Sequence, residues 1–204
     1  MPPRAYRSPA RAAASEKTRA RIVAAAAKLL RARGIGEFSL ESVARSARVT
    51  RLTVYNHFGS RRALLEAVFD DRAARGGLHK IRDAMTDRDP QAGLNQVIAI
   101  FCGFWSFDRG AIARLHGVGS SDAEFEESIR SRNERRRRLL SVLVGRMVEQ
   151  GDVRSDAAAD LTDMLFVLTS FSVFAELISG KRSTDAACAM IQQSAEDAIK
   201  RAAK

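Results

Sequence analysis

Residues 38–64 read FSLESVARSARVTRLTVYNHFGSRRAL, and this stretch decides the interpretation of the whole chain. Ser39 and Thr50 are residue types that favour the N-terminal cap of a helix, and each precedes a short apolar pattern. Gly59 is placed to end the second pattern. The spacing predicts two short helices joined by a tight turn, which is a helix-turn-helix.

The flanking residues predict two longer helices around this core motif. Apolar residues recur at helical spacing between Ser15 and Arg33, and Ser60 can cap a further helix that carries Leu64, Leu65, Val68 and Phe69. We therefore expect residues 15–82 to form one small helical domain that ends in a connecting helix. Residues 1–14 are interpreted as a disordered basic tail.

The remainder of the chain, residues 83–204, also has a helical pattern and no strand-like alternation. Pro90 suits the first turn of a helix, and Asp108 suits the cap of the next one. Together with the N-terminal part this predicts an all-α protein with a larger C-terminal helical domain. The expected helices there are 90–107, 108–115, a long one from Ser121 or Asp122 to before Gly151, Ser155–Ser179 and Thr184–Ala202.

The positive charge of the chain is concentrated at its N-terminal end. Residues 1–62 hold 14 Lys and Arg against 3 Asp and Glu, net +11, whereas residues 63–204 hold 20 against 21, net −1. A basic segment joined to a near-neutral one indicates a polyanionic partner for the basic segment. Nucleic acid is the expected partner, because no basic amphipathic anchor for a membrane is evident.

No residue pattern indicates catalysis, a cofactor or a metal ion. Cys102 and Cys188 are far apart in the sequence and belong to no metal-binding spacing, and we interpret both as core thiols in a reducing cytoplasm. His79 and His116 have no ligand partners at metal spacing. With no nucleophile–base pair or phosphate loop in the sequence, we expect a cytoplasmic protein that is not an enzyme.

The run from Leu40 to Phe58, followed by Ser60-Arg61 and Leu64, resembles the signature of TetR-type transcriptional regulators. Those proteins carry an Ile-Ala or Val-Ala pair on the second helix, Ala-Gly-Val-Ser at the turn, and then Thr-Leu-Tyr-x-His-Phe and Ser-Lys. The similarity covers roughly residues 15–70. It implies that the chain binds double-stranded DNA through the second helix of the motif, residues 51–58.

In the major groove, residues near the start of a recognition helix reach base edges. Arg51 is the best candidate for reading guanine, and Leu52 for touching a thymine methyl group. The resemblance implies phosphate contacts from Thr53, Tyr55 and His57, and Arg61 at the start of the next helix is also expected to bind phosphate. The complete candidate set for DNA is Arg48, Thr50, Arg51, Leu52, Thr53, Tyr55, Asn56, His57 and Arg61.

Two positions depart from the family pattern. Arg48 stands where the family usually has Gly, and a left-handed conformation costs a non-Gly residue about 1–2 kcal/mol. We therefore expect a slightly reshaped turn. Leu52 replaces a residue that is often Gly or Pro, so the base preference of this chain is expected to be its own.

The four arginines at 135–138 lie on a predicted helix and point all round its axis. We interpret them as a solvated face with acidic neighbours such as Glu134, in preference to a second site for nucleic acid.

The resemblance places the pairing surface of a homodimer on the last two long helices. Their apolar residues spread around the helix, which is more than one face of a monomer needs. A homodimer would align two recognition helices with a palindrome. The candidate interface residues are Leu161, Leu168, Phe174, Leu177, Ile178 and Ile191.

Aromatic residues in the middle helices suggest an apolar cavity for a small-molecule effector. Cys102, Ser106, His116 and Thr169 are candidates for its polar contacts. The sequence is equally compatible with a core that these aromatic side chains simply fill. The candidate pocket residues are Phe101, Phe104, Trp105, Phe107, Leu115, His116, Met164 and Phe171.

The sequence thus predicts a DNA-binding transcriptional regulator, a repressor in the first instance, that binds a palindromic operator as a homodimer. A lipophilic or aromatic ligand would release it by shifting the population of two conformations. The alternative is a DNA-binding regulator that is constitutive or answers to a protein partner. An all-α enzyme using the C-terminal pocket is a third, less favoured interpretation.

Overall fold

A computed structural model describes residues 9–33, 36–118 and 123–203, and within these ranges the chain contains helices and no strand. The all-α prediction is confirmed. The helices are α1 (Pro9–Arg33), α2 (Leu40–Ala47), α3 (Arg51–Phe58), α4 (Arg61–Arg75), η1 (Leu78–Lys80), α5 (Ile81–Ala84), α6 (Pro90–Phe107), α7 (Arg109–Val118), α8 (Ala123–Gln150), η2 (Ser155–Ala157), α9 (Ala158–Leu168), α10 (Phe171–Ser179) and α11 (Thr184–Ala202).

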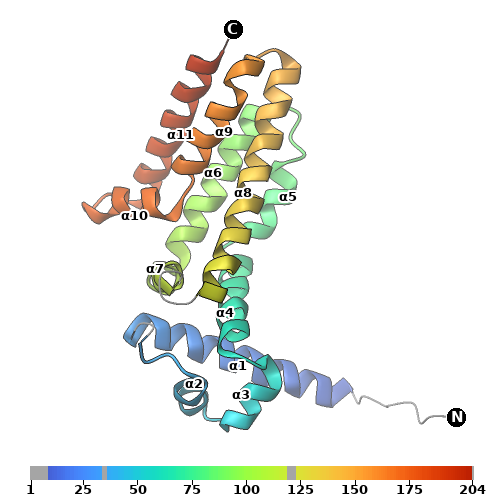
Figure 1. The fold of residues 1–204 in the computed structure, drawn as a ribbon, viewed down its shortest axis with the longest axis vertical. Helices are drawn as coiled ribbons and strands as arrows, with labels where there is room; N and C mark the ends of the chain where they lie inside the picture. Colours follow the sequence, from blue (N-terminus) through green and yellow to red (C-terminus); the bar gives the residue numbers. More distant parts are fainter. Residues whose placement is uncertain (1–8, 34–35, 119–122, 204) are drawn as a thin grey trace, which may run out of the picture.

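The first three helices form one end of the molecule (Figure 1). α1 crosses beneath the rest and packs against α2, α4 and α7. Its apolar face buries Ile22, Ala26 and Leu30 completely. Val54 of α3 and Leu64 of α4 are also fully buried, so the two short helices are held on α1 and α4 by a continuous apolar core.

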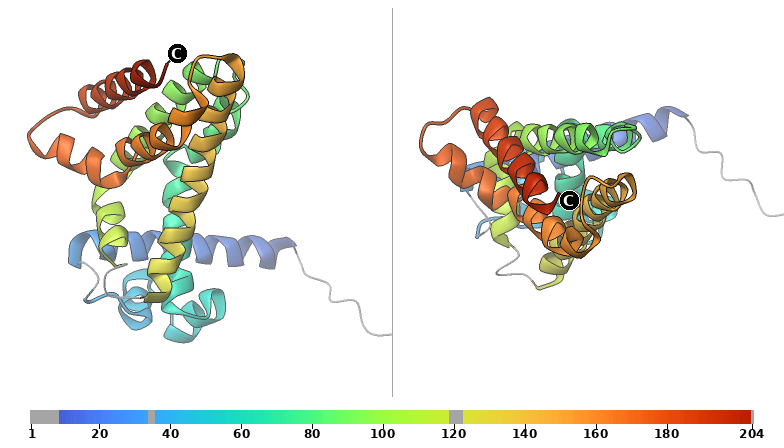
Figure 2. Two further views of the ribbon diagram at one scale, coloured as in Figure 1. Left: turned by 45° about the horizontal axis from the view of Figure 1, so that its top comes forward. Right: turned by 90° about the horizontal axis from the view of Figure 1, so that it is seen from above.

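The other end is a bundle in which α6, α8, α9 and α11 pack side by side (Figures 1 and 2). α4 rises from the α1–α3 end and contacts both α6 and α8, while α10 projects from the side of the bundle. Helix α4 is therefore the element through which the two ends of the molecule are joined, together with the contact between α1 and α7.

The prediction of one long helix over Ser155–Ser179 is wrong. Helix α9 ends at Leu168, α10 begins at Phe171, and the two segments are bent by 50°. The Thr169 hydroxyl donates to the carbonyl of Leu165 at 2.8 Å, and the extended Ser170 accepts a hydrogen bond from the Val173 amide at 3.3 Å. Ser170 thus caps a new helix, and its extended backbone cannot continue α9.

Other details of the helices also differ from the sequence prediction. α1 begins at Pro9, so residues 9–14 of the expected disordered tail are helical, and its residues 1–8 lie outside the described residues. The short η1 and α5 between α4 and α6 were not predicted. The starts proposed for α8 at Ser121 or Asp122 also lie outside the described part of the chain.

In the described ranges, no single helix combines the length and the apolar composition needed to cross a membrane. The bent pair Ser155–Leu168 and Phe171–Ser179 meets both conditions only when its two segments are taken together.

Candidate DNA interface and ligand pocket

Three polar caps fix the ends of the helix-turn-helix, as the sequence predicts. The Ser39 hydroxyl accepts from the Ser42 amide at 3.0 Å, and the Ser42 hydroxyl in turn accepts from the Ser39 amide at 2.9 Å. Thr50 accepts from the Thr53 amide at 3.1 Å, and Ser60 from the Ala63 amide at 3.0 Å. Each cap accepts a hydrogen bond from an amide that the helix itself leaves unpaired. These helices therefore begin at the residues that the sequence predicts.

Arg48 adopts the left-handed conformation, with φ 54° and ψ 49°. The amide of Val49 donates to the carbonyl of Ala44 at 3.0 Å, which is the bond that closes a helix ending in a left-handed residue. The expectation of a reshaped turn is wrong: Arg48 takes the conformation that Gly usually supplies. The turn therefore has the same backbone shape that Gly would give it, at a cost in backbone strain.

One face of α3 is available to a partner. Arg51, Leu52, Tyr55 and Asn56 are exposed, with Leu52 and Tyr55 retaining 66% and 57% of their accessible surface. Exposed side chains of this size and polarity, three and four residues apart, form one continuous strip on a helix. The residues predicted to read base edges therefore lie on an exposed surface of α3.

Two other residues predicted to contact DNA, Thr53 and His57, are less exposed. Thr53 is half-buried and its hydroxyl lies 2.8 Å from that of Thr50. His57 is half-buried beside Phe58, with the ring centroids 6.1 Å apart. The side chains of Thr53 and His57 therefore make contacts within the fold, and the DNA contacts expected of them stay predictions.

Arg61 also has a structural partner. Its Nε donates to the carbonyl of Phe38 at 3.1 Å, and its guanidinium lies 5.8 Å from the centre of the Phe38 ring. Arg61 thereby holds the segment that leads into α2. The phosphate contact expected of it stays a prediction.

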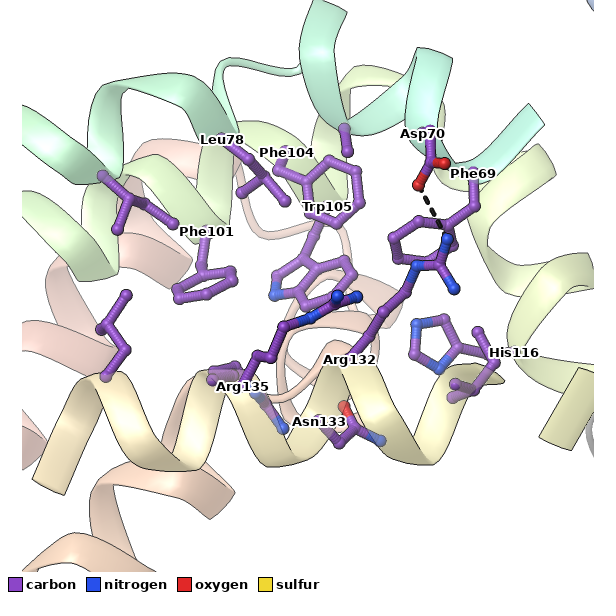
Figure 3. Close-up of a pocket in the computed structure, with 15 residues that line it drawn as sticks. Phe69, Asp70, Leu78, Phe101, Phe104, Trp105, His116, Arg132, Asn133 and Arg135 are labelled. Atoms are coloured by element: carbon purple, nitrogen blue, oxygen red, sulfur yellow. Dashed lines mark hydrogen bonds and ion pairs between the residues drawn. The ribbon is translucent and has the colours of Figure 1, made fainter. Parts of the chain in front are cut away.

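A cavity of about 230 Å³ opens between α4, α6 and α8 (Figure 3). Four of the eight predicted pocket residues line it: Phe101, Phe104, Trp105 and His116. The complete lining comprises Phe69, Asp70, Ala73, Leu78, Ile81, Phe101, Phe104, Trp105, His116, Ile129, Arg132, Asn133, Arg135, Arg136 and Leu139.

The other four predicted pocket residues lie elsewhere. Leu115 is fully buried in the packed core, and Met164 is 45% exposed on α9. Phe107 is 42% exposed and lies beneath the guanidinium groups of Arg72 and Arg75.

Phe171 is not part of the lining but packs directly on a residue that is. Its ring stacks on His116 with centroids 5.0 Å apart and planes 16° apart. Of the polar candidates apart from His116, Cys102, Ser106 and Thr169 do not line this cavity.

The sequence reasoning missed the walls that α4 and α8 contribute. On α8, Ile129, Arg132, Arg136 and Leu139 recur at spacings of three and four and so share one face. That periodicity could have identified the face, but the run of arginines masked it. The interpretation of this run as a solvated face is wrong for Arg136, which is 7% exposed.

Arg136 is a buried cation. Its guanidinium lies 4.3 Å from the ring centre of Phe166, and its Nη1 donates to Thr169 Oγ1 at 3.4 Å, while its Nε has no partner among the described residues. Burial, and then the charge of Arg137, lower the pKa of Arg136 to about 10. The side chain is therefore still protonated at neutral pH.

His116 is a largely buried neutral group beside this cation. Burial, and then the charge of Arg136, lower the pKa of His116 to about 4. Its Nε2 is buried without a hydrogen-bond partner in the described structure. The imidazole packs edge-on against the Trp105 ring, with the centroids 5.5 Å apart.

An ion pair across the cavity ties the connecting helix to the bundle. Arg132 of α8 donates to Asp70 of α4 at 2.7 Å, drawn as a dashed line in Figure 3. The same guanidinium lies 4.5 Å from the ring centre of Phe69, also on α4. A change in the position of Arg132 would therefore alter its contacts with Asp70 and Phe69 on α4.

Half of the predicted dimer residues belong to the core of the single chain. Leu161, Phe174 and Ile191 are 4%, 0% and 2% exposed, and the helices that carry them, α9, α10 and α11, pack against one another. Leu168, Leu177 and Ile178 are half-buried against the same core. The large apolar side chains that remain exposed on α9 and α11 are Met164, Val167 and Met190.

Comparison with known proteins gives sequence matches to the helix-turn-helix end of the molecule. The sequence profile described as "Bacterial regulatory proteins, tetR family" matches residues 22–68. The HTH-type transcriptional regulator SrpR of Pseudomonas putida is 43% identical over 61 residues, which is 30% of this chain and 29% of that protein. The uncharacterized HTH-type transcriptional regulator TtgW, also of Pseudomonas putida, is 41% identical over 61 residues, 30% of this chain and 46% of that protein. The aligned segment therefore spans less than half the length of either relative.

Solved structures resemble the whole chain in fold. A TetR transcription regulator from Haloarcula marismortui superposes with a TM-score of 0.74 at 17% identity, covering 93% of this chain and 100% of that one. A protein from Saccharomonospora viridis, crystallised in complex with choline, superposes with a TM-score of 0.70 at 16% identity, covering 91% and 96%. The profile match identifies residues 22–68 as a helix-turn-helix segment of the TetR type of bacterial regulatory proteins, and the described helices as a whole share the fold of solved TetR regulators.

Proposed function

We propose that this protein is a cytoplasmic transcriptional repressor that binds a palindromic DNA operator as a homodimer, and that a small lipophilic or aromatic molecule releases it. It would act without catalysing a reaction. The observation that carries the proposal is the exposed strip of α3, formed by Arg51, Leu52, Tyr55 and Asn56.

DNA binding is supported by the position of this strip in a basic segment. The net charge of +11 over residues 1–62 would attract the phosphate backbone, and the capped ends of α3 would present the strip to base edges. Binding of this kind weakens steeply as salt rises, because bound cations are released from the DNA.

Pairing of two chains is supported by the apolar side chains left exposed on α9 and α11. Met164 and Val167 are 45% and 53% exposed on α9, and Met190 is 47% exposed on α11. The two helices pack against each other and lie at the end of the molecule far from α3 (Figure 1). A dimer formed there would leave both α3 strips free for two half-sites of a palindrome.

Release by a ligand is supported by the shared wall of the cavity and the connecting helix. Phe69, Asp70 and Ala73 of α4 line the cavity, and α4 continues directly from the helix-turn-helix. A ligand that fits only one position of α4 would favour that position. The spacing of the two α3 helices in a dimer would change with it, and DNA would be released.

The test has two arms. The bound sequence is first selected from random DNA, and its affinity is measured against salt concentration; a specific inverted repeat and a steep fall in affinity with salt are expected. Small apolar molecules that bind the protein are then added to the complex. Absence of sequence preference would refute the DNA-binding role, and an operator complex unaffected by a ligand that measurably binds would refute the switch.

A further inference from the structure

The cavity lining carries an excess of positive charge. Arg132, Arg135 and Arg136 contribute three guanidinium groups, and Asp70 contributes the one carboxylate among the lining residues. Asp70 is already paired with Arg132 at 2.7 Å. In the described ranges, no carboxylate lies within ion-pair distance of the guanidinium nitrogens of Arg135 or Arg136. The pocket therefore offers two cations that the described part of the chain does not neutralise.

Of the two arginines, Arg136 is the stronger indication of an anionic ligand, because it is buried. A charged side chain with 7% exposure is normally paired with a counter-ion, since removal of a charge from water is costly. Here the partners are a long bond of 3.4 Å to Thr169 and two aromatic rings, Phe166 at 4.3 Å and Phe101 at 5.9 Å. Neither a hydroxyl nor a ring face neutralises the charge.

A second polar atom at the same cavity also lacks a partner. Arg136 Nε and His116 Nε2 are buried side-chain nitrogens without a hydrogen bond in the described structure. Buried polar atoms in proteins are bonded in the great majority of cases. Both exceptions belong to residues that line this cavity, so the oxygen atoms of a ligand could satisfy them.

The rest of the wall is apolar and aromatic. Phe69, Phe104 and Trp105 form a contiguous set, with ring centroids 5.8 Å apart for Phe69 and Phe104 and 4.5 Å apart for Phe104 and Trp105. In Figure 3 these rings lie on one side of the cavity, and Arg132 and Arg135 extend into it from α8 on the other. Such a surface would bind the apolar body of a ligand whose charged end faces the arginines.

We infer that the pocket selects organic anions, namely molecules with an aromatic or aliphatic body and a terminal carboxylate that binds Arg136 near His116. A guanidinium fork matches a carboxylate in geometry as well as in charge. The inference names the chemical class of the effector in the proposed function and rests on it for regulatory meaning. Binding itself requires no DNA.

The experiment uses Trp105 as a reporter, since it is the one tryptophan of the chain and lines the cavity. The full chain is titrated without DNA with 4-phenylbutyrate, its neutral amide 4-phenylbutyramide and the cation 4-phenylbutylamine. Decanoate and decanamide provide a second matched pair. Tryptophan fluorescence and calorimetry follow binding. At least one carboxylate should bind about tenfold or more tightly than its amide, with the amine weakest.

Arg136→Met should remove this preference and leave the affinity for the amide within about twofold of the original. Arg136→Lys should retain part of it, which separates loss of charge from loss of packing. Arg130→Gln is the matched control on the same helix, because Arg130 pairs at the surface with Glu126 and Glu127 at 3.6 and 3.4 Å. Circular dichroism and urea unfolding verify that each variant folds; Arg136→Gln replaces Arg136→Met if the latter does not.

Equal affinity for carboxylates and amides, no binding of any probe, or an unchanged preference in the folded Arg136 variants would each overturn the inference. Failure of the protein to bind DNA would count against the proposed function alone, since none of these titrations contains DNA.

Discussion

Arg72 of α4 donates a hydrogen bond to Asp108 at the junction of α6 and α7 over 2.8 Å, and each side chain is more than nine-tenths buried. Arg31 of α1 donates to the same carboxylate oxygen at 2.5 Å. Burial by itself would lower the pKa of Arg72, but the hydrogen bonds of Asp71 and Asp108 outweigh it and raise that pKa. One carboxylate thus joins α1 and α4 to the end of the helix that forms much of the pocket wall.

Asp108→Asn should destabilise the fold, because it leaves Arg72 buried with only Asp71 to balance its charge. Breaking one partner of a buried ion pair costs about 3–5 kcal/mol. Urea unfolding followed by circular dichroism measures the free energy of unfolding. Asp163→Asn is the control, since Asp163 pairs with Arg137 at a site where the carboxylate is 66% exposed, and it should cost less than about 1 kcal/mol. Equal effects of the two substitutions would contradict the structural role of Asp108.

Arg48→Gly should stabilise the protein. The residue has φ 54°, so glycine relieves about 1–2 kcal/mol of left-handed strain, partly offset by the greater freedom of glycine in the unfolded chain. The expected net gain is a few tenths to about 1 kcal/mol in the free energy of unfolding. Arg48→Val should have the opposite sign, since a β-branched residue is strained more by this conformation. A loss of stability with glycine would mean that the side chain of Arg48 contributes contacts that outweigh the strain.

Acid should destabilise the protein through His116. Its pKa falls from 6.5 to about 4 on folding, so below pH 6.5 the unfolded chain binds a proton that the folded chain does not. The stabilising contribution is complete above pH 6.5 and is lost as the pH falls toward 4, to the extent of about 3 kcal/mol.

His116→Phe should remove this part of the pH dependence, because phenylalanine keeps the stack on Phe171 and does not titrate. The less buried His79 serves as the control in His79→Gln. Unfolding free energies measured at neutral pH and at two acidic values, one on each side of pH 5, decide the matter. Parallel pH profiles for wild type and His116→Phe would contradict the burial of a neutral imidazole at this site.

Sedimentation at micromolar concentration should show a dimer. The double variant Met164→Glu/Val167→Glu places two charges on the exposed apolar surface of α9 and should weaken dimerisation by about 3 kcal/mol or more, roughly a hundredfold in Kd. Ala113→Glu, at an exposed position on α7, should leave the dimer unchanged. A monomeric wild-type protein would refute the proposed architecture, and a dimer unaffected by the double variant would place the interface elsewhere.

The helix-turn-helix was predictable because its signals are local. Ser39, Thr50 and Ser60 each form the cap that their residue type favours, and the helices begin one residue later. The bend after Leu168 was not predicted, because the residues on both sides of it are apolar and the hydrophobic pattern continues across the break. The cap at Ser170 was the available signal, and it was hidden in a long hydrophobic segment.

The pocket was only half predictable for the opposite reason. Phe101, Phe104 and Trp105 are close in sequence and indicate an aromatic wall, but Phe69 and Arg136 reach the same cavity from helices that only the tertiary fold brings together. Likewise, Leu161 and Phe174 are residue types that suit either an interface or a core. Only their burial in the folded chain shows that they are core residues.

Selection of bound sequences from random DNA decides whether the exposed strip of α3 reads a palindromic DNA sequence. The wild-type protein should enrich an inverted repeat whose half-sites are about one helical turn apart. Arg51→Ala should lose base preference at one symmetric position at a cost of about 1–3 kcal/mol, whereas Arg61→Ala should weaken binding to all sequences alike. No enrichment, or an unchanged preference in Arg51→Ala together with an altered one in Arg61→Ala, would contradict the account.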